Sequence, residues 1–481
     1  MSLTHNVVYN ILINVLNVAI PIITVPYVSR VFGVENVGVV NFALTYAAYF
    51  SLFVCLGIPV YGVREIGKCK DDPVQRNYIV SELFRIMLIS TLFFTSLYVI
   101  SIFVIPTLYA ERVFLLAAGA GLIFSPFNVD WYYTGRENLK IVALRNMAVK
   151  ILGVAILFIF VRSSRDIILY LILNTIANVG AQVWTFVYML RHEIVLQYRK
   201  LNLKRHIKPV LILFLSSLAI SIYTMLDTLM LGFLSDYTQV GYYSSAIKIS
   251  RLLLPLVTAA AAASIPRIAY LYKENNRSEL NRVTNKAFSF MALLAPPITI
   301  GLIAISKPFV PWFFGEAFMG AVPSMMVVSI IVLLIGVNNF YGPQVLLTTG
   351  NDKAFMGAVI LGTISNFMLN LFFIPCWGAL GASWASVVAE SIVTATVIIL
   401  ASRLVPEIKP DYRPLIHSIV ASLPMLLYGY VFSRYIDSLF WSVGCITIFS
   451  VLTFGILELF VFRDSTALDI RNRIFSKLRL Q

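Results

Sequence analysis

Eight charged side chains stand inside long apolar stretches of the sequence or at their ends. An ionised group within a stretch that crosses a bilayer costs about 2.5–3.5 kcal/mol, so such residues are functional candidates. We therefore take these positions as the first candidates for binding a charged substrate or ion. They are Arg30, Glu82, Arg85, Asp130, Asp227, Lys248, Arg251 and Glu390.

Lys248 and Arg251 are three residues apart and so share one face of a helix. Asp227, in the preceding apolar stretch, could pair with either of them across two adjacent helices. Two cations would still stand against one acid, and Arg30 would add to the excess if it faced the same cavity. A cationic cavity favours an anionic substrate such as a phosphate, which Arg holds in a bidentate fork and Lys as a point charge.

Glu82 and Arg85 are also three residues apart, which suits either an ion pair within one helix or two polar groups lining a cavity. Asp130 lies near the inner end of its stretch, where a structural cap or loop contact is favoured over substrate contact. We expect Glu390 to have a structural or gating role.

Pro21 and Pro26 interrupt the first apolar stretch. Proline within a membrane helix marks a kink, which suits either a gate that bends or a fixed curvature.

The sequence carries no catalytic or cofactor signature. It has no Gly-x-x-x-x-Gly-Lys-Ser/Thr motif for binding ATP, and no pair of its four cysteines has metal or redox spacing. No long water-exposed stretch is present to carry a glycosyltransferase site. We expect no enzymatic activity, no cofactor and no metal site.

The composition places the elements that carry these residues in a membrane. The chain of 481 residues is 59% hydrophobic and only 12% charged, whereas soluble domains are about 25% charged. A membrane-spanning helix needs about 20 mostly apolar residues. That length predicts an all-α, polytopic protein with about fourteen spans, at 7–30, 38–62, 78–105, 112–134, 141–162, 166–190, 209–233, 241–265, 284–306, 320–346, 355–374, 381–404, 415–434 and 439–462.

The basic residues predict the orientation. The net charge is +14, and most Lys and Arg residues fall in alternate loops, as the positive-inside rule requires. This pattern places both termini in the cytoplasm and explains the charge without nucleic-acid binding, which we do not expect.

A faint internal repeat suggests two lobes of six helices. Val37-Gly38 opens the second span and Val240-Gly241 opens the eighth. A repeat offset by an even number of spans gives two parallel lobes. We predict an N-lobe at 1–205, a C-lobe at 206–405, two further helices at 406–462 and a basic cytoplasmic tail at 463–481.

Three motifs resemble those of one family of transporters. The first runs from Pro26 to Gly33 and is followed by Val37-Gly38. The second is Asp130-Trp131-Tyr132-Tyr133-Thr134-Gly135-Arg136-Glu137, in which Thr134 stands where the family commonly has Gln. The third is Asp227-Thr228-Leu229-Met230-Leu231-Gly232, with Gly241-Tyr242-Tyr243-Ser244-Ser245-Ala246 and Lys248 following. Together they resemble the polysaccharide (Wzx-type, O-antigen and teichoic-acid) flippases of the MOP (MATE-like) exporter superfamily.

This resemblance implies a fold and a function. It implies two six-helix bundles facing a central cavity that opens alternately to each side, plus two extra helices. It implies carriage of an undecaprenyl-pyrophosphate-linked oligosaccharide from the inner to the outer leaflet of the bacterial cytoplasmic membrane. The resemblance implies that Arg30, Lys248 and Arg251 bind the head group of the substrate. It also implies that Asp227 balances charge or binds a coupling ion, H⁺ or Na⁺. The other expected partners are membrane lipids.

Two other functions compete with this one. A MATE-like exporter of cationic drugs would need an acidic cavity, which Glu82, Asp227 and Glu390 could supply, but Arg85, Lys248 and Arg251 oppose it. A membrane polysaccharide polymerase or ligase would usually carry a sizeable outer loop with catalytic Arg or His. The predicted outer loops are short and contain no His.

Overall fold

The chain is built from helices that are long and apolar enough to cross a membrane. The computed structural model describes residues 3–69, 71–464, 466–468 and 471–472. Within these ranges, nine helices meet the length and hydropathy of a span, or ten if the bent pair Tyr237–Ala259 and Ala263–Lys273 is one span. No strand occurs among the described residues. The predicted all-α, polytopic class is confirmed.

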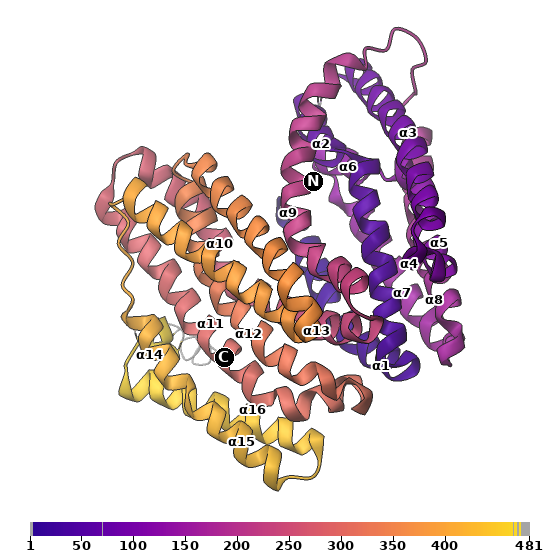
Figure 1. Cartoon of the computed structure of the whole chain (residues 1–481). Coiled ribbons are helices and arrows are strands. Elements are labelled where there is room, and N and C mark those ends of the chain that lie inside the picture. The colour runs from indigo at the N-terminus through magenta and orange to yellow at the C-terminus, as the bar shows by residue number, and fades with distance from the viewer. Residues whose placement is uncertain (1–2, 70, 465, 469–470, 473–481) are drawn as a thin grey trace. The chain divides into compact units, whose positions relative to one another are not determined.

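The contacts divide the chain into two compact units, Met1–Phe233 and Leu234–Gln481 (Figure 1). The first unit contains the following elements. They are α1 (Leu3–Cys55), α2 (Ile58–Lys68), α3 (Pro73–Val104), α4 (Pro106–Ala110), α5 (Arg112–Gly119), η1 (Ala120–Phe127), α6 (Asp130–Gly135), α7 (Leu139–Phe160), η2 (Ser164–Asp166), α8 (Ile167–His192) and α9 (Lys204–Leu234).

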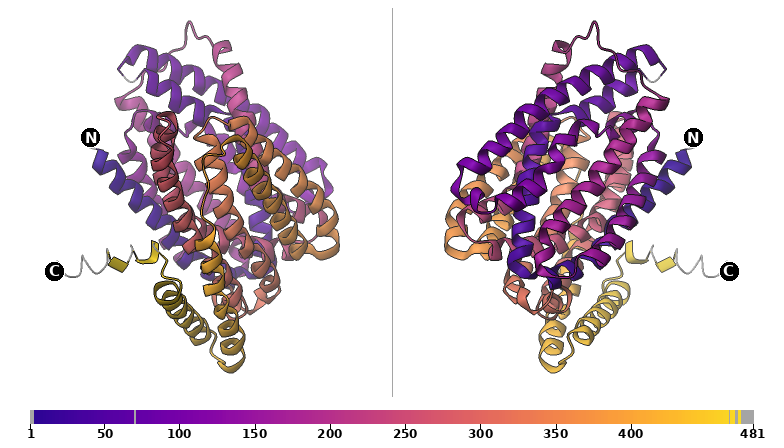
Figure 2. Two further views of the ribbon diagram at one scale, coloured as in Figure 1. Left: turned by 90° about the vertical axis from the view of Figure 1, so that its left-hand side faces the viewer. Right: turned by 90° about the vertical axis from the view of Figure 1, so that its right-hand side faces the viewer.

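The second unit is organised around α11, against which α10, α12, α14, α15 and α16 all pack. Figure 2 shows α15 and α16 as a hairpin at one end of this unit. Its elements are α10 (Tyr237–Lys273), α11 (Arg277–Phe314), η3 (Glu316–Ala321), α12 (Val322–Asn339), η4 (Phe340–Leu347), α13 (Asp352–Leu404), α14 (Arg413–Ser422), α15 (Pro424–Tyr435), α16 (Leu439–Ile456) and η5 (Leu457–Val461).

Polar side chains fix where several of these helices begin. Asp72 precedes Pro73 and accepts a hydrogen bond from the backbone N–H of Gln75, so it caps α3. Asp236 caps α10 in the same way, by accepting from the N–H of Gln239. Between these ends the helices expose many large apolar side chains, such as Phe93 and Leu427. Lipid rather than water is the solvent for such surfaces.

Two glycines break the longest helical stretches. Gly33 in α1 has φ 76° and Gly378 in α13 has φ 55°, values that L-residues rarely adopt. Each stretch of 53 residues is therefore two helices joined at a kink. Pro21 and Pro26 lie within the first of the two helices of α1, and the kink expected at these prolines stays a prediction.

The contacts group α9 with the first unit, which ends at Phe233, while the predicted lobe boundary at 205/206 stays a prediction. Gly57 approaches the backbone of Val210 and Phe214, and Gly232 lies against the ring of Phe42. Most of the predicted basic tail lies outside the described residues, namely 465, 469–470 and 473–481.

Candidate functional site

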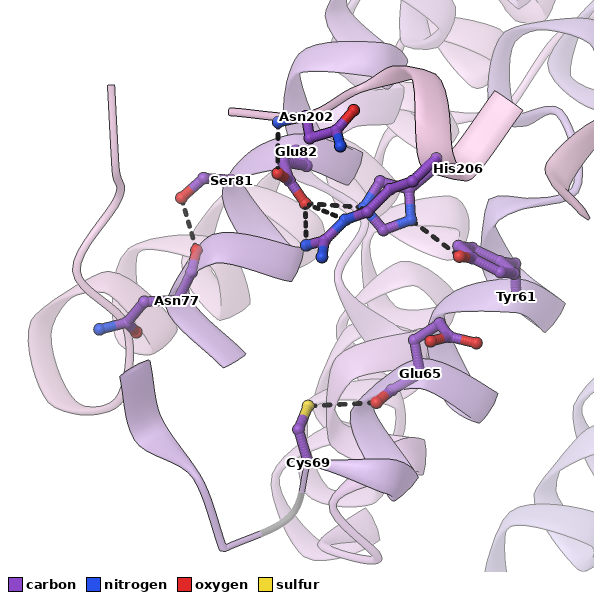
Figure 3. Close-up of polar contacts among 9 residues, drawn as sticks. Tyr61, Glu65, Cys69, Asn77, Ser81, Glu82, Asn202 and His206 are labelled. Atoms are coloured by element: carbon purple, nitrogen blue, oxygen red, sulfur yellow. Dashed lines mark hydrogen bonds and ion pairs between the residues drawn. The ribbon is translucent and has the colours of Figure 1, made fainter. Parts of the chain in front are cut away.

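A buried carboxylate, Glu82, is the centre of a polar cluster in the first unit (Figure 3). One of its oxygens, Oε1, accepts a hydrogen bond of 2.6 Å from the backbone N–H of Asn202. The other, Oε2, accepts from Arg205, with Nε at 3.1 Å and Nη2 also in contact, and lies 2.7 Å from Nε2 of His206. These donors stabilise the ionised carboxylate away from water.

The ring of His206 connects this carboxylate to α2. Its Nδ1 atom lies 2.8 Å from the hydroxyl of Tyr61, and both side chains are buried. An ionised carboxylate only accepts hydrogen bonds, so Nε2 of His206 carries a proton. In the neutral ring Nδ1 then accepts from the Tyr61 hydroxyl, and the bond to Glu82 fixes the tautomer.

The same face of α3 holds the chain segment that precedes α9. The N–H of Val195 donates to Oδ1 of Asn77 at 3.2 Å, and the N–H of Gln197 donates to Oγ of Ser81 at 2.8 Å. With the bond from Asn202 to Glu82, three backbone groups are held by one helix, as Figure 3 shows in part. The cluster thus attaches the start of α9 to α2 and α3.

This arrangement differs from the role that the sequence suggested for Glu82 and Arg85. The charged partners of Glu82 come from the segment at 205–206, whereas the Arg85 side chain is exposed on α3. The sequence analysis did not single out Arg205 or His206. No local spacing links them to Glu82, because they lie 123 and 124 positions away from it in the chain.

Asp130 is held by a second ion pair. The Arg145 guanidinium donates from Nη1 to Oδ1 at 2.7 Å and from Nη2 to Oδ2 at 2.8 Å, a bidentate fork. Nη1 also donates to Oγ1 of Thr185 at 2.8 Å. The fork and the bond to Thr185 therefore join α6 to α7 and α8, and the structural role expected for Asp130 stays a prediction.

The motif from Asp130 to Glu137 packs α6 closely on α2. A Cβ on Gly62 would lie 2.3 Å from the ring of Trp131, and a Cβ on Gly135 would lie 2.9 Å from the Val63 carbonyl oxygen. Glycine at both positions lets the two helices approach. The Tyr132 hydroxyl donates to Oε2 of Glu193 at 2.8 Å, just beyond the end of α8.

Cys69 follows α2 and does not have the environment of a reactive thiol. Its Sγ donates to the carbonyl oxygen of Glu65 at 3.1 Å, and burial raises the pKa of the thiol above its ordinary value. No group of three or more His, Cys, Asp or Glu side chains that could hold a metal occurs in the part of the chain that the structure describes.

The basic candidates of the predicted cavity are all exposed. Arg30 lies on α1 in the first unit, and Lys248 and Arg251 lie on α10 in the second. The residues around Lys248 on α10, such as Ile247 and Ile249, are buried, so the two cations mark the one accessible face of this part of the helix.

Asp227 and Glu390 are both buried. Asp227 lies on α9 in the first unit, where it interacts electrostatically with Tyr49 of α1. Glu390 lies on α13 in the second unit. The shared cavity that the sequence suggested for Asp227, Lys248 and Arg251 stays a prediction.

The helices define a multi-pass membrane protein. Comparison with known families is consistent with this class: residues 3–272 match the sequence model of the family described as "Polysaccharide biosynthesis protein", and residues 213–372 match that described as "MatE". The chain belongs to the polysaccharide biosynthesis protein family, and the predicted resemblance to MOP-superfamily flippases is confirmed.

Relatives of known description agree with this family. The chain is 25% identical over 411 residues to a putative O-antigen transporter of Escherichia coli, covering 83% of this chain and 96% of the relative. It is 28% identical over 188 residues to the probable flippase AglR of Haloferax volcanii, covering 38% of each.

Solved structures share the fold. The inward closed conformation of the lipid II flippase MurJ superposes with a TM-score of 0.65 at 16% identity, covering 91% of this chain and 98% of that one. An inward-facing MATE family multidrug transporter of the MOP superfamily gives 0.60 at 16% identity, covering 82% and 95%.

Proposed function

We propose that this protein is a flippase for a lipid-linked oligosaccharide. It carries the glycan, attached to undecaprenyl pyrophosphate, from the inner to the outer leaflet of the bacterial cytoplasmic membrane. Transport proceeds by alternating access through a cationic cavity. Membership of the polysaccharide biosynthesis protein family supports this function, as do relatives described as an O-antigen transporter and a flippase.

The observation that carries the proposal is the pair of exposed cations on α10. Lys248 and Arg251 are both exposed and lie three residues apart on one face of α10, where Ile247, Ile249 and Ser250 beside them are buried. A pyrophosphate carries the negative charge that two such cations attract, and Arg can hold it in a bidentate fork. Arg30 adds a third cation, and Asp227 balances charge or binds a coupling ion, H⁺ or Na⁺.

The proposed topology has fourteen spans with both termini in the cytoplasm. The nine or ten helices that pass the length criterion include two stretches, Ala19–Lys68 and Asp352–Leu404, long enough for two spans each. Breaks at Gly33 and Gly378 support counting each as two. Shorter apolar helices at Arg112–Phe127 and Thr224–Leu234 support the two remaining spans.

A MATE-like antiporter of cationic drugs is the second candidate, since the fold is shared. Such a protein needs carboxylates free to bind cations. Glu82 forms an ion pair with Arg205 and a hydrogen bond with His206, and Asp130 forms an ion pair with Arg145. Two of the four acids that stand in the apolar stretches are thereby occupied within the protein, which favours an anionic substrate.

Deletion of the gene in its native host tests the proposal. The measurement is the leaflet location of lipid-linked oligosaccharide, assayed together with surface polysaccharide. We expect the oligosaccharide to accumulate on the cytoplasmic side and the surface polysaccharide to be lost. An unchanged lipid-linked pool with an intact coat would contradict the flippase, and drug-accumulation assays would then test the exporter.

A further inference from the structure

A basic cavity of about 660 Å³ lies beside the first turns of α11 in the second unit. Its charged lining comes from Arg282 and Lys286 of α11 and from Lys409 and Asp411 of the segment between α13 and α14. Asn285 and Ser289 add polar groups. The volume is within the range of small-ligand sites, about 300–1,000 Å³.

The wall that carries Lys409 is held in place by two asparagines of α11. The N–H of Lys409 donates to Oδ1 of Asn281 at 3.2 Å, and Nδ2 of Asn285 donates to the carbonyl oxygen of Lys409 at 3.3 Å. The N–H of Asp411 donates to Oδ1 of Asn285 at 2.6 Å. These three bonds fix the backbone opposite α11, so the cavity exists before any ligand arrives.

The lining has an excess of positive charge. Three cations face one acid, and that acid, Asp411, accepts from the N–H of Arg413 at the start of α14. Arg282 also contacts Glu279 at 2.7 Å, a pair in which the Arg282 side chain is 77% exposed. Solvent weakens an ion pair as exposed as this one, so the cavity still attracts anions.

The position along α11 places this cavity at a membrane surface. A second basic cavity, of about 460 Å³, is lined by Lys307 of the same helix and by Arg434 of α15. Lys286 and Lys307 are roughly 30 Å apart at 1.5 Å per residue, which is the thickness of the hydrocarbon core. Between these two cavities, α14 and α15 expose apolar side chains, among them Ile416 and Leu427.

We propose that the cavity of Arg282, Lys286 and Lys409 binds the phosphate of an anionic phospholipid head group. The cations and polar groups contact the phosphate, and the acyl chains lie along the exposed apolar surface of α14 and α15. Basic pockets between membrane helices on the cytoplasmic side bind such head groups. The inference is independent of the transported substrate, since it requires only that the second unit lies in a bilayer with this cavity at the cytoplasmic surface.

Binding of defined lipids to the purified full-length chain in detergent tests this site. Native mass spectrometry measures the affinity for phosphatidylglycerol, for phosphatidylcholine and for inorganic pyrophosphate. We expect phosphatidylglycerol to bind most tightly. The double variant K286Q/K409Q should bind it about twentyfold more weakly, because each Lys near a membrane surface contributes about fivefold.

The matched control is K273Q/R403Q, which removes the same charge from two exposed positions that do not line the cavity. Its affinity for phosphatidylglycerol should stay within about twofold of the unmodified chain. If both variants bound phosphatidylglycerol equally weakly, general electrostatic attraction would explain the loss, and the proposed site would be wrong. Tight binding of pyrophosphate that displaces the lipid would overturn the lipid assignment, and so would equal affinity for the two lipids.

Discussion

The Nε2 atom of His206 lies 2.7 Å from Oε2 of Glu82, although 124 positions separate the two residues in the chain. Both side chains are 2% exposed, and the Tyr61 hydroxyl occupies the opposite nitrogen of the ring. Three helices, α2, α3 and α9, therefore meet at one polar cluster. A buried cluster of this kind is stable only while each member keeps its partners.

The variant Glu82→Gln should destabilise the first unit. It removes the charge that accepts from Arg205 and His206 and leaves their donors facing an amide. Loss of a hydrogen bond to a charged group costs about 2 kcal/mol. Thermal unfolding of the purified protein in detergent should show a lower Tm.

Glu65→Gln provides the control for this variant. Glu65 contacts Arg64 and Lys68, whose side chains are 52% and 62% exposed. Ion pairs as exposed as these contribute about 0–1 kcal/mol, so Tm should change little. A Glu82→Gln protein as stable as Glu65→Gln would show that the buried cluster contributes nothing to folding.

Hydropathy and spacing were enough to predict the class of this fold. Every long helix falls on a predicted apolar span, because the bilayer dictates both length and composition. Pattern alone did not show that α1 and α13 continue across two spans each. A single glycine with positive φ makes that connection, and Gly33 and Gly378 look like ordinary glycines in the sequence.

The sequence was less informative about which intramembrane charges pair within the protein. Spacing on one helix suggested Arg85 as a partner of Glu82, but the partners come from distant positions, as they also do for Asp130 and Arg145. Pairing across helices depends on how the helices are arranged in space, which local periodicity does not encode. The motif around Trp131 was more informative, since its glycine and aromatic residues reflect close packing on α2.

Arg145→Lys should weaken the contact among α6, α7 and α8. Lysine keeps the charge but cannot donate two parallel hydrogen bonds to Asp130 and a third to Thr185. We expect a loss of about 2 kcal/mol, measured by thermal unfolding, with transport per folded molecule unchanged because we propose a structural role for Asp130. Arg165→Lys, on an exposed residue of η2, is the control. Normal stability with lost transport would instead place Asp130 at the substrate.

Arg251→Ala should insert into the membrane normally but lose transport. The side chain is exposed on α10, and in the proposed cavity its removal deprives the substrate of a bidentate partner. A loss of about tenfold or more in transport corresponds to one charge-assisted hydrogen bond. The measurement is restoration of surface polysaccharide in the deletion strain at matched protein level. Arg277→Ala, exposed at the start of α11, is expected to restore it fully, and full restoration by Arg251→Ala would contradict the cationic cavity.

Gly62→Ala should destabilise the contact between α2 and α6. The added Cβ would lie 2.3 Å from Cε3 of Trp131, a residue that is only 5% exposed. Overpacking of this kind costs about 1–3 kcal/mol. Gly153→Ala in α7 is the matched control, because its Cβ would meet nothing within 4 Å. Alanine is the better helix former by about 0.8–1.0 kcal/mol, so that variant should keep or raise Tm. If both variants unfold at the same temperature, the close approach of α2 to Trp131 does not limit stability.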